Sequence, residues 1–277
     1  MSVKLLCVSS AITAFFAVSA CSAAGDIVQD VTSELPSNFS EADNDSENAI
    51  VAGAVEFTDS EERDDARRDF EYFWPAEVSA IPALAQQMQQ KRSEALAQQK
   101  EEWQSALTDL AEFDCGACRN NSFARNWEVV ADLPQFLSLS ANQYVYGGGA
   151  HGNYWFDSMI WDRKAEAALA PRSMFVSDAA LGDAVRQEYC AALDVERAKR
   201  RGGTVEPGLF ADCPASEELT LLIGSTDGAS FNRLGLLAAP YVAGPYVEGS
   251  YEVTLPMNAA ILEAVKPEYR ENFALGE

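Results

Sequence analysis

The chain has 277 residues, of which 43 are acidic and 20 basic, giving a formal net charge of −23 at pH 7. A chain this acidic repels nucleic acid and anionic lipid headgroups and attracts cationic partners, so we expect it not to bind nucleic acid. Acidity alone is more often a means of staying soluble than a binding determinant.

The first 20 residues have the features of a lipoprotein signal peptide. One positive charge precedes a nearly uninterrupted apolar run at 5–17, which is too short to cross a bilayer as a helix. The run ends in Val18-Ser19-Ala20-Cys21, which resembles the lipobox of bacterial lipoproteins and implies acylation of Cys21. We therefore expect a periplasmic protein held to the membrane by a lipid anchor, and Ser22 favours the outer membrane of a Gram-negative bacterium. The alternative is an ordinary signal peptide cleaved near Ala23 or Ala24.

Residues 21–52 predict an acidic, disordered tether. Positions 22–52 hold seven acidic residues, no Lys or Arg and few aromatic residues. Such a segment cannot bury enough apolar surface to offset the entropy lost on ordering. The residues from 53 onward suffice for one large domain or two small ones.

The first half of this region predicts strands around one long helix. Segments 55–57 and 70–74 are rich in aromatic and β-branched residues, which favour strands. A helix is expected from about Pro82 to Glu112, because proline suits a first turn and apolar residues follow at helical spacing. Its narrow apolar stripe consists of Leu84, Met88, Leu96, Trp103, Leu107 and Ala111. The period then changes to two, which predicts strands at 127–130, 136–139, 144–146 and 154–161.

The second half predicts a helix followed by a final sheet. Ser177 can cap a helix that runs to about Arg201 and is closed by two glycines. Further strands are expected at 219–223, 235–238 and 251–255, and a closing helix at 259–265. Because strands and helices come in blocks, we predict an α+β fold with mainly antiparallel sheets.

Basic residues cluster in the last turn of the second helix, namely Arg197, Lys199, Arg200 and Arg201. Favourable interaction with the negative end of the helix dipole is the preferred explanation. The alternative is contact with an anionic glycan or lipid A.

Four cysteines lie beyond the signal and the lipid site: Cys115, Cys118, Cys190 and Cys213. An even number in an exported chain predicts disulfides. Three pairings are possible, and we favour Cys115 with Cys118 and Cys190 with Cys213. A redox motif or a zinc site at Cys115-Gly-Ala-Cys118 is the alternative, although this motif follows a helix rather than a strand.

The segment 144–155, YVYGGGAHGNYW, contains the only histidine and matches G-x-G-x-x-G. A dinucleotide site needs a helix after the glycines, but aromatic, strand-like residues follow, so we predict a strand-to-strand turn and no nucleotide ligand. His151 is expected to pin the turn through ring hydrogen bonds, with a catalytic or binding role as alternatives. If the turn binds a ligand, the neighbours of His151 there are Tyr146, Asn153 and Trp155. We assign no catalytic residue, metal or cofactor.

Tyr146-Gly-Gly-Gly-Ala-His-Gly-Asn153 resembles the Y-x-G-G-A-H-[GP]-N signature of an extracytoplasmic domain family. This family includes the N-terminal region of the peptidoglycan deacetylase PdaC and the extracellular part of the anti-sigma factor RsiV. Residues 241–249 with the strand at 251–256 resemble its C-terminal segment, and 70–75 its opening strand.

The resemblance implies a two-part α+β module, which we divide into subdomains 53–165 and 166–277. In the deacetylase, catalysis belongs to a separate metal-dependent domain, and this chain has a single histidine. We therefore expect a non-catalytic envelope lipoprotein that binds peptidoglycan or a cationic protein such as lysozyme. The alternatives are an envelope-polymer hydrolase with a site near His151 and a structural lipoprotein without a dedicated ligand.

Overall fold

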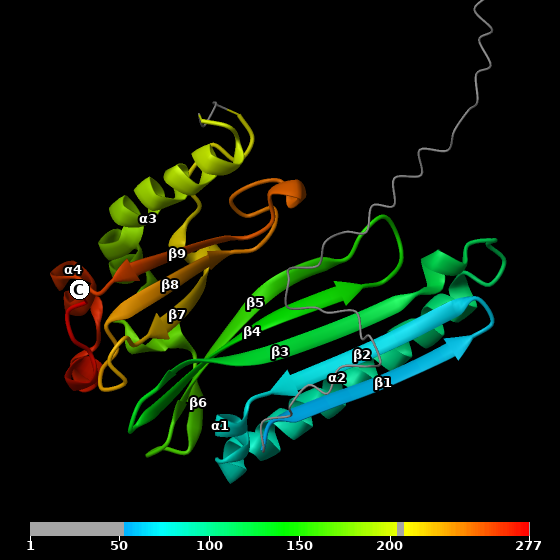
Figure 1. Ribbon diagram of the computed structural model, residues 1–277, viewed down its shortest axis with the longest axis horizontal. Helices are drawn as coiled ribbons and strands as arrows, with labels where there is room; N and C mark the ends of the chain where they lie inside the picture. Colours follow the sequence, from blue (N-terminus) through cyan, green and yellow to red (C-terminus); the bar gives the residue numbers. More distant parts are fainter. Residues whose placement is uncertain (1–52, 204–207, 277) are drawn as a thin grey trace, which may run out of the picture. The chain divides into compact units, whose positions relative to one another are not determined.

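The computed structural model describes residues 53–203 and 208–276, in which a six-stranded and a three-stranded sheet follow each other along the chain (Figure 1). The predicted signal peptide, the tether and the lipid site at Cys21 lie outside the described residues. Within the described ranges, none of the helices combines the length and hydrophobicity needed to cross a bilayer.

The first sheet keeps its strands in chain order. They are β1 (Val55–Arg63), β2 (Ala66–Trp74), β3 (Asn121–Asp132), β4 (Phe136–Tyr146), β5 (Asn153–Asp162) and β6 (Ala167–Leu169). All neighbours are antiparallel except β2 and β3, which run parallel. A parallel pair needs a long crossover, and the short α1 (Ala76–Ser79) and the long α2 (Pro82–Asp109) supply it.

Helix α2 packs on one face of this sheet and runs alongside β1 and β2 (Figure 1). Leu84 and Met88 of the predicted stripe are buried against the aromatic face of β2, and Trp103 of the same stripe is buried beside Arg68. Gln99, which the stripe omits, is buried with them. The helix ends at Asp109, earlier than the predicted Glu112, because the chain turns there toward the short η1 (Gly116–Arg119) and β3.

The second sheet is antiparallel and is covered by helices. It consists of β7 (Thr220–Gly224), β8 (Arg233–Ala238) and β9 (Tyr251–Pro256), with α3 (Asp178–Arg200) and α4 (Ala259–Ala264) packed against it. The predicted cap is confirmed, since the Ser177 side chain accepts a hydrogen bond from the Ala180 amide. Helix α3 buries residues at every fourth position: Leu181, Val185, Tyr189, Leu193 and Arg197.

Strands β4 and β5 contribute to two separate cores. Leu137 and Leu139 face the core beneath α2, whereas Phe136 and Ile160 belong to the core of the second sheet. Because side chains alternate along a strand, one apolar strand can serve both cores. This double burial explains why these strands are apolar on both faces.

The predicted α+β class with mainly antiparallel sheets is confirmed. One difference is that the separately predicted strands 136–139 and 144–146 form the single strand β4, which continues through the polar residues Asn142 and Gln143. The short α1 and β6 were not predicted. The proposed boundary between 165 and 166 falls in the turn between β5 and β6 and stays a prediction.

Candidate ligand groove

The glycine-rich segment 147–152 joins β4 to β5, which confirms the predicted strand-to-strand turn. Gly148 and Gly149 have φ angles of 84° and 105°, a region that favours glycine. A Cβ atom on Gly148 would lie 2.4 Å from the carbonyl oxygen of Cys118, so the turn packs closely against η1. The hydroxyl of Tyr146 donates to the Gly149 carbonyl oxygen at 2.9 Å and closes the turn.

His151 lies on the exposed side of this turn and contacts the segment before β9. Its Nδ1 is 2.7 Å from the carbonyl oxygen of Gly152, and its ring stacks on Tyr246 with 4.0 Å between centroids. Its Nε2 is 3.5 Å from the hydroxyl of Tyr241. Among the described residues, no carboxylate or serine hydroxyl hydrogen-bonds the ring.

The two sequence motifs therefore meet in space. Tyr154, just after the first motif, accepts a hydrogen bond from the Ser250 amide at 2.9 Å, and its ring lies edge-on to Tyr246. Tyr241 adopts a φ of 70°, a conformation uncommon for a tyrosine. The aromatic contacts fix the segment 241–250 onto the first sheet, so this part of the signature joins the two halves.

A groove of about 380 Å³ opens between α2 and the open face of β3, β4 and β5. Helix α2 contributes Ala95, Gln98, Gln99 and Glu102, and the strands and turn contribute Asn121, Ser122, Phe123, Gln143, Val145, Tyr146, Gly147 and Trp155. Of the four predicted ligand-binding residues, Tyr146 and Trp155 line this groove. His151 and Asn153 do not, and both are exposed.

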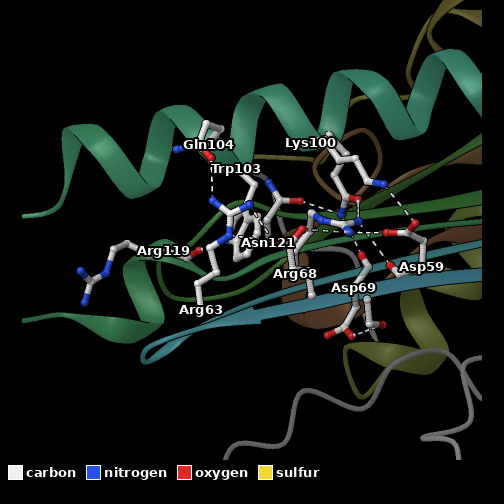
Figure 2. Close-up of polar contacts among 12 residues, drawn as sticks. Asp59, Arg63, Arg68, Asp69, Lys100, Trp103, Gln104, Arg119 and Asn121 are labelled. Carbon is white, nitrogen blue, oxygen red and sulfur yellow. Dashed lines mark hydrogen bonds and ion pairs between the residues drawn. The ribbon is translucent and has the colours of Figure 1, made fainter.

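Polar side chains of β1, β2 and α2 contact one another next to the groove-lining residue Asn121 (Figure 2). Arg68 on β2 is 1% exposed, forms an ion pair with Asp59 and donates to the Gln99 side-chain oxygen at 3.1 Å. Burial works to raise the pKa of Asp59, but hydrogen bonds from Arg68 and Lys100 outweigh it and lower that pKa. The Gln99 side-chain nitrogen donates to Asn121 at 2.9 Å and to the backbone of Asp69.

A second arginine lies next to the groove on the same face of the sheet. Arg125 on β3 donates to the side-chain oxygen of Gln143 on β4, and its guanidinium is 3.8 Å from Asp157. Gln143 is directly opposite Trp155 in the β4–β5 ladder, so both side chains lie on the face that α2 partly covers.

Gln99, Asn121 and Gln143 were not predicted from the sequence as residues of a site. The only available signal was the polar pair Asn142-Gln143 within an otherwise apolar strand pattern, which instead led us to divide β4.

The basic cluster on α3 is engaged in internal contacts. Arg197 is 0% exposed and donates to three backbone carbonyls, those of Ala211, Asp212 and Ala243. Arg200 donates to the carbonyls of Glu248 and Ser250, and Arg201 forms a two-bond ion pair with the Glu248 carboxylate. These arginines hold neighbouring loops to the helix end, a role that neither the dipole explanation nor the anionic-ligand alternative includes.

Both favoured disulfides are present, Cys115–Cys118 and Cys190–Cys213. The first closes the loop that packs on Gly148, and the second joins α3 to the segment before β7. In the part of the chain that the structure describes, no three His, Cys, Asp or Glu side chains gather as a metal-binding group.

Residues 61–154 match the family model described as Deacetylase PdaC, from β1 through the glycine-rich turn to the start of β5. This match confirms the resemblance indicated by the turn signature. None of the curated proteins matches the chain.

Two solved structures are similar to this chain. One is a DUF3298 family protein from Pseudomonas aeruginosa PAO1, with 14% identity, a TM-score of 0.47, and coverage of 77% of this chain and 94% of that one. The other is a member of the DUF3298 family from Bacteroides fragilis NCTC 9343, with 15% identity, a TM-score of 0.48, and coverage of 79% and 95%.

Proposed function

We propose that this protein, which carries a PdaC-type domain at residues 61–154, is a non-catalytic envelope lipoprotein that binds cell-wall glycan in the groove beside α2. The observation that carries the proposal is the composition of the groove lining. The rings of Phe123, Tyr146 and Trp155 stand beside the side-chain amides of Gln98 and Gln143. Aromatic rings pack on the apolar faces of sugar rings, while amides hydrogen-bond hydroxyl and carbonyl groups, so this combination suits a saccharide.

The groove also favours binding over hydrolysis. Glycoside hydrolysis usually requires two carboxylates across the scissile bond, and Glu102 is the single carboxylate among the residues that line the groove. The rival proposal is an envelope-polymer hydrolase that uses His151. It predicts turnover of peptidoglycan or ester substrates by the wild type, abolished in a folded His151→Ala variant. Such turnover would overthrow the non-catalytic proposal.

Binding is tested by co-sedimentation of the secreted, oxidised chain 22–277 with purified peptidoglycan sacculi. We expect Trp155→Ala to weaken sedimentation by about tenfold, since an aromatic ring in a binding site commonly contributes more than 1 kcal/mol. Tyr241→Ala removes an exposed aromatic ring outside the groove and is the matched control. Equal binding by wild type and Trp155→Ala would refute the groove as the site, and no sedimentation of the wild type would refute glycan binding. The third possibility, a structural lipoprotein without a ligand, predicts that last result.

A cationic protein such as lysozyme is the second candidate, favoured by the net charge of −23. The outer surface of α2 adds Glu101, Glu102 and Asp109 in one shallow depression. Binding through these charges should disappear when salt is raised to about 0.5 M, because screening shortens the range of the interaction. Binding to sacculi through the uncharged groove residues should persist at that salt concentration.

The two disulfides and the extracytoplasmic family fit a location outside the cytoplasm. The finer location, a lipid anchor at Cys21 in the outer membrane, is part of the proposal and is supported by the lipobox-like sequence. A Cys21→Ala variant is expected to lose acyl labelling and to remain uncleaved. Normal processing and labelling of that variant would contradict the anchor.

A further inference from the structure

We infer that the groove selects N-acetylated sugars, because two arginines of the first sheet, the buried Arg68 and the partly exposed Arg125, orient the amide groups of Asn121 and Gln143 so that both present N–H donors to the ligand. This inference rests on the proposed glycan binding and names the chemical group that the groove recognises. The group is the carbonyl oxygen of an acetamido substituent; because Asn121 and Gln143 are separated by about four residues of the β3–β4 register, roughly 13 Å, each donor serves a different sugar of the chain.

The orientation of Gln143 follows from its contact with Arg125. A guanidinium has only donors, so the oxygen of the Gln143 side chain must face it. The nitrogen therefore points away from Arg125, and it has no partner among the described residues. Gln143 is 7% exposed and lines the groove, so its NH₂ group is a nearly buried donor that a ligand can satisfy.

The orientation of Asn121 follows from a chain of two hydrogen bonds. Arg68 donates to the oxygen of Gln99, which turns the nitrogen of Gln99 toward Asn121. That nitrogen donates, so the oxygen of Asn121 must accept. The remaining NH₂ group of Asn121 has no partner within the described ranges and is the second donor at the groove. Gln99 is 3% exposed and Arg68 1% exposed, so solvent does not compete for this arrangement.

Two fixed donors favour a group that only accepts hydrogen bonds. A sugar hydroxyl could accept from them as well, but its own hydrogen would find no acceptor on these two amides, whereas a carbonyl or carboxylate oxygen is satisfied by donors alone. Glu102 in the groove and the net charge of −23 disfavour a carboxylate. Among the uncharged groups of a cell-wall sugar that only accept, the acetamido carbonyl is a stronger acceptor than the ring and glycosidic oxygens. Trp155, directly across the ladder from Gln143, offers an aromatic ring to the same sugar.

The experiment compares two probes by calorimetry with the secreted, oxidised chain 22–277: a hexamer of N-acetylglucosamine and the same hexamer without its acetyl groups. Both titrations are made in about 0.5 M salt, which screens the attraction of the acidic chain for the cationic, deacetylated hexamer. We expect the wild type to bind the acetylated hexamer about tenfold or more tightly, because the other lacks the acceptor and leaves the two amide donors unpaired. Gln143→Glu and Asn121→Asp retain the internal hydrogen bond but turn a carboxylate oxygen toward the ligand. Both should lose the preference or reverse it toward the cationic, deacetylated hexamer.

Gln104→Glu is the matched control. The Gln104 side-chain oxygen also accepts from an arginine, Arg63, at 2.8 Å (Figure 2), but Gln104 is not among the residues that line the groove. This variant adds the same charge and should leave the preference unchanged. A loss of preference in Gln104→Glu equal to that in Gln143→Glu would show a general charge effect and overturn the inference.

The same proteins are sedimented with sacculi, which separates the two proposals. If the wild type binds sacculi but treats both hexamers alike, or prefers the deacetylated one, the acetamido inference is wrong and glycan binding stands. If the wild type binds neither sacculi nor hexamers, the proposed function itself fails.

Discussion

The glycine-rich turn allows a sharp test of how the first half of the molecule is held together. Gly147, Gly148 and Gly149 are consecutive, yet they differ in two physical respects. Gly148 and Gly149 both have positive φ angles, whereas only Gly148 also faces a close neighbour. At Gly147 and Gly149 an added Cβ atom would meet nothing within 4 Å. Three alanine substitutions therefore separate backbone strain from packing.

The expected magnitudes follow from these differences. Gly147→Ala should leave the free energy of unfolding unchanged or raise it by up to about 1 kcal/mol, because alanine restricts the unfolded chain. Gly149→Ala should lower it by about 1 kcal/mol, the strain of an L-residue at positive φ less the same unfolded-state gain. Gly148→Ala adds a Cβ atom 2.4 Å from a backbone oxygen of Cys118, which must move. Overpacking costs about 1–3 kcal/mol, so the total is about 2–4 kcal/mol.

Cys118 is held in place by its neighbours, which is why we expect the larger loss of stability for Gly148→Ala. It is bonded to Cys115, and the next residue is held by a 2.8 Å hydrogen bond from the Trp103 indole to the Arg119 carbonyl. The assay is urea unfolding followed by tryptophan fluorescence, with the slope of the transition checked for constancy. If Gly148→Ala is no less stable than Gly149→Ala, the close packing of the turn on η1 is wrong.

Three further predictions use the same unfolding assay. Replacing Cys190 and Cys213 together by serine should lower stability by about 3 kcal/mol, as expected for a disulfide with a sequence separation of 23, and an unchanged midpoint would contradict this. The hydrogen bond from Arg201 lowers the pKa of Glu248 in the folded protein. The ion pair therefore stabilises the fold fully above the pKa that Glu248 has in the unfolded chain, and this stabilisation is lost as the pH falls through the pKa of Glu248 in the folded protein. Glu248→Gln should therefore cost about 1–2 kcal/mol at pH 7, with the difference narrowing below about pH 4; a difference constant with pH would count against the ion pair. His151→Ala should lower the free energy of unfolding by less than about 1 kcal/mol because the ring is exposed. A larger loss would contradict this and show that the stacking of the ring on Tyr246 stabilises the fold.

Local patterns were enough to predict most of the elements. Apolar residues recur at helical spacing on α2 and at closer spacing on the strands that follow. These spacings reflect which side chains face the core, and they can be read from the sequence. The parallel pairing of β2 with β3 was not predictable in this way. It depends on the path of the connection through α2, and the side-chain pattern of either strand does not show that path. The division of β4 into two predicted strands has a similar cause: Gln143 is polar, yet it is buried through a partner on another strand.

The residues of the candidate site were harder to predict from local patterns than the helices and strands. Tyr146, His151, Asn153 and Trp155 were predicted together because they are close to one another in the sequence, in or beside the glycine-rich signature. A tight turn, however, sends neighbouring residues to different surfaces. Tyr146 and Trp155 line the groove, whereas His151 stacks on Tyr246 and helps to attach the second half. A short sequence signature can thus combine residues that line a groove with residues that join two parts of the fold.

The donors of the groove depend on arginines that no sequence spacing connects to them. Arg68 is 31 positions from Gln99, and Gln99 is 22 positions from Asn121, so each contact exists only after α2 has crossed the sheet. A side-chain amide can be placed in either of two orientations of nearly the same shape, and the neighbouring hydrogen-bond donor, an arginine or another amide, decides which end faces the groove. The chemical selectivity of such a groove is therefore a property of the tertiary fold. Substitutions that reverse one amide, with the fold unchanged, test it directly.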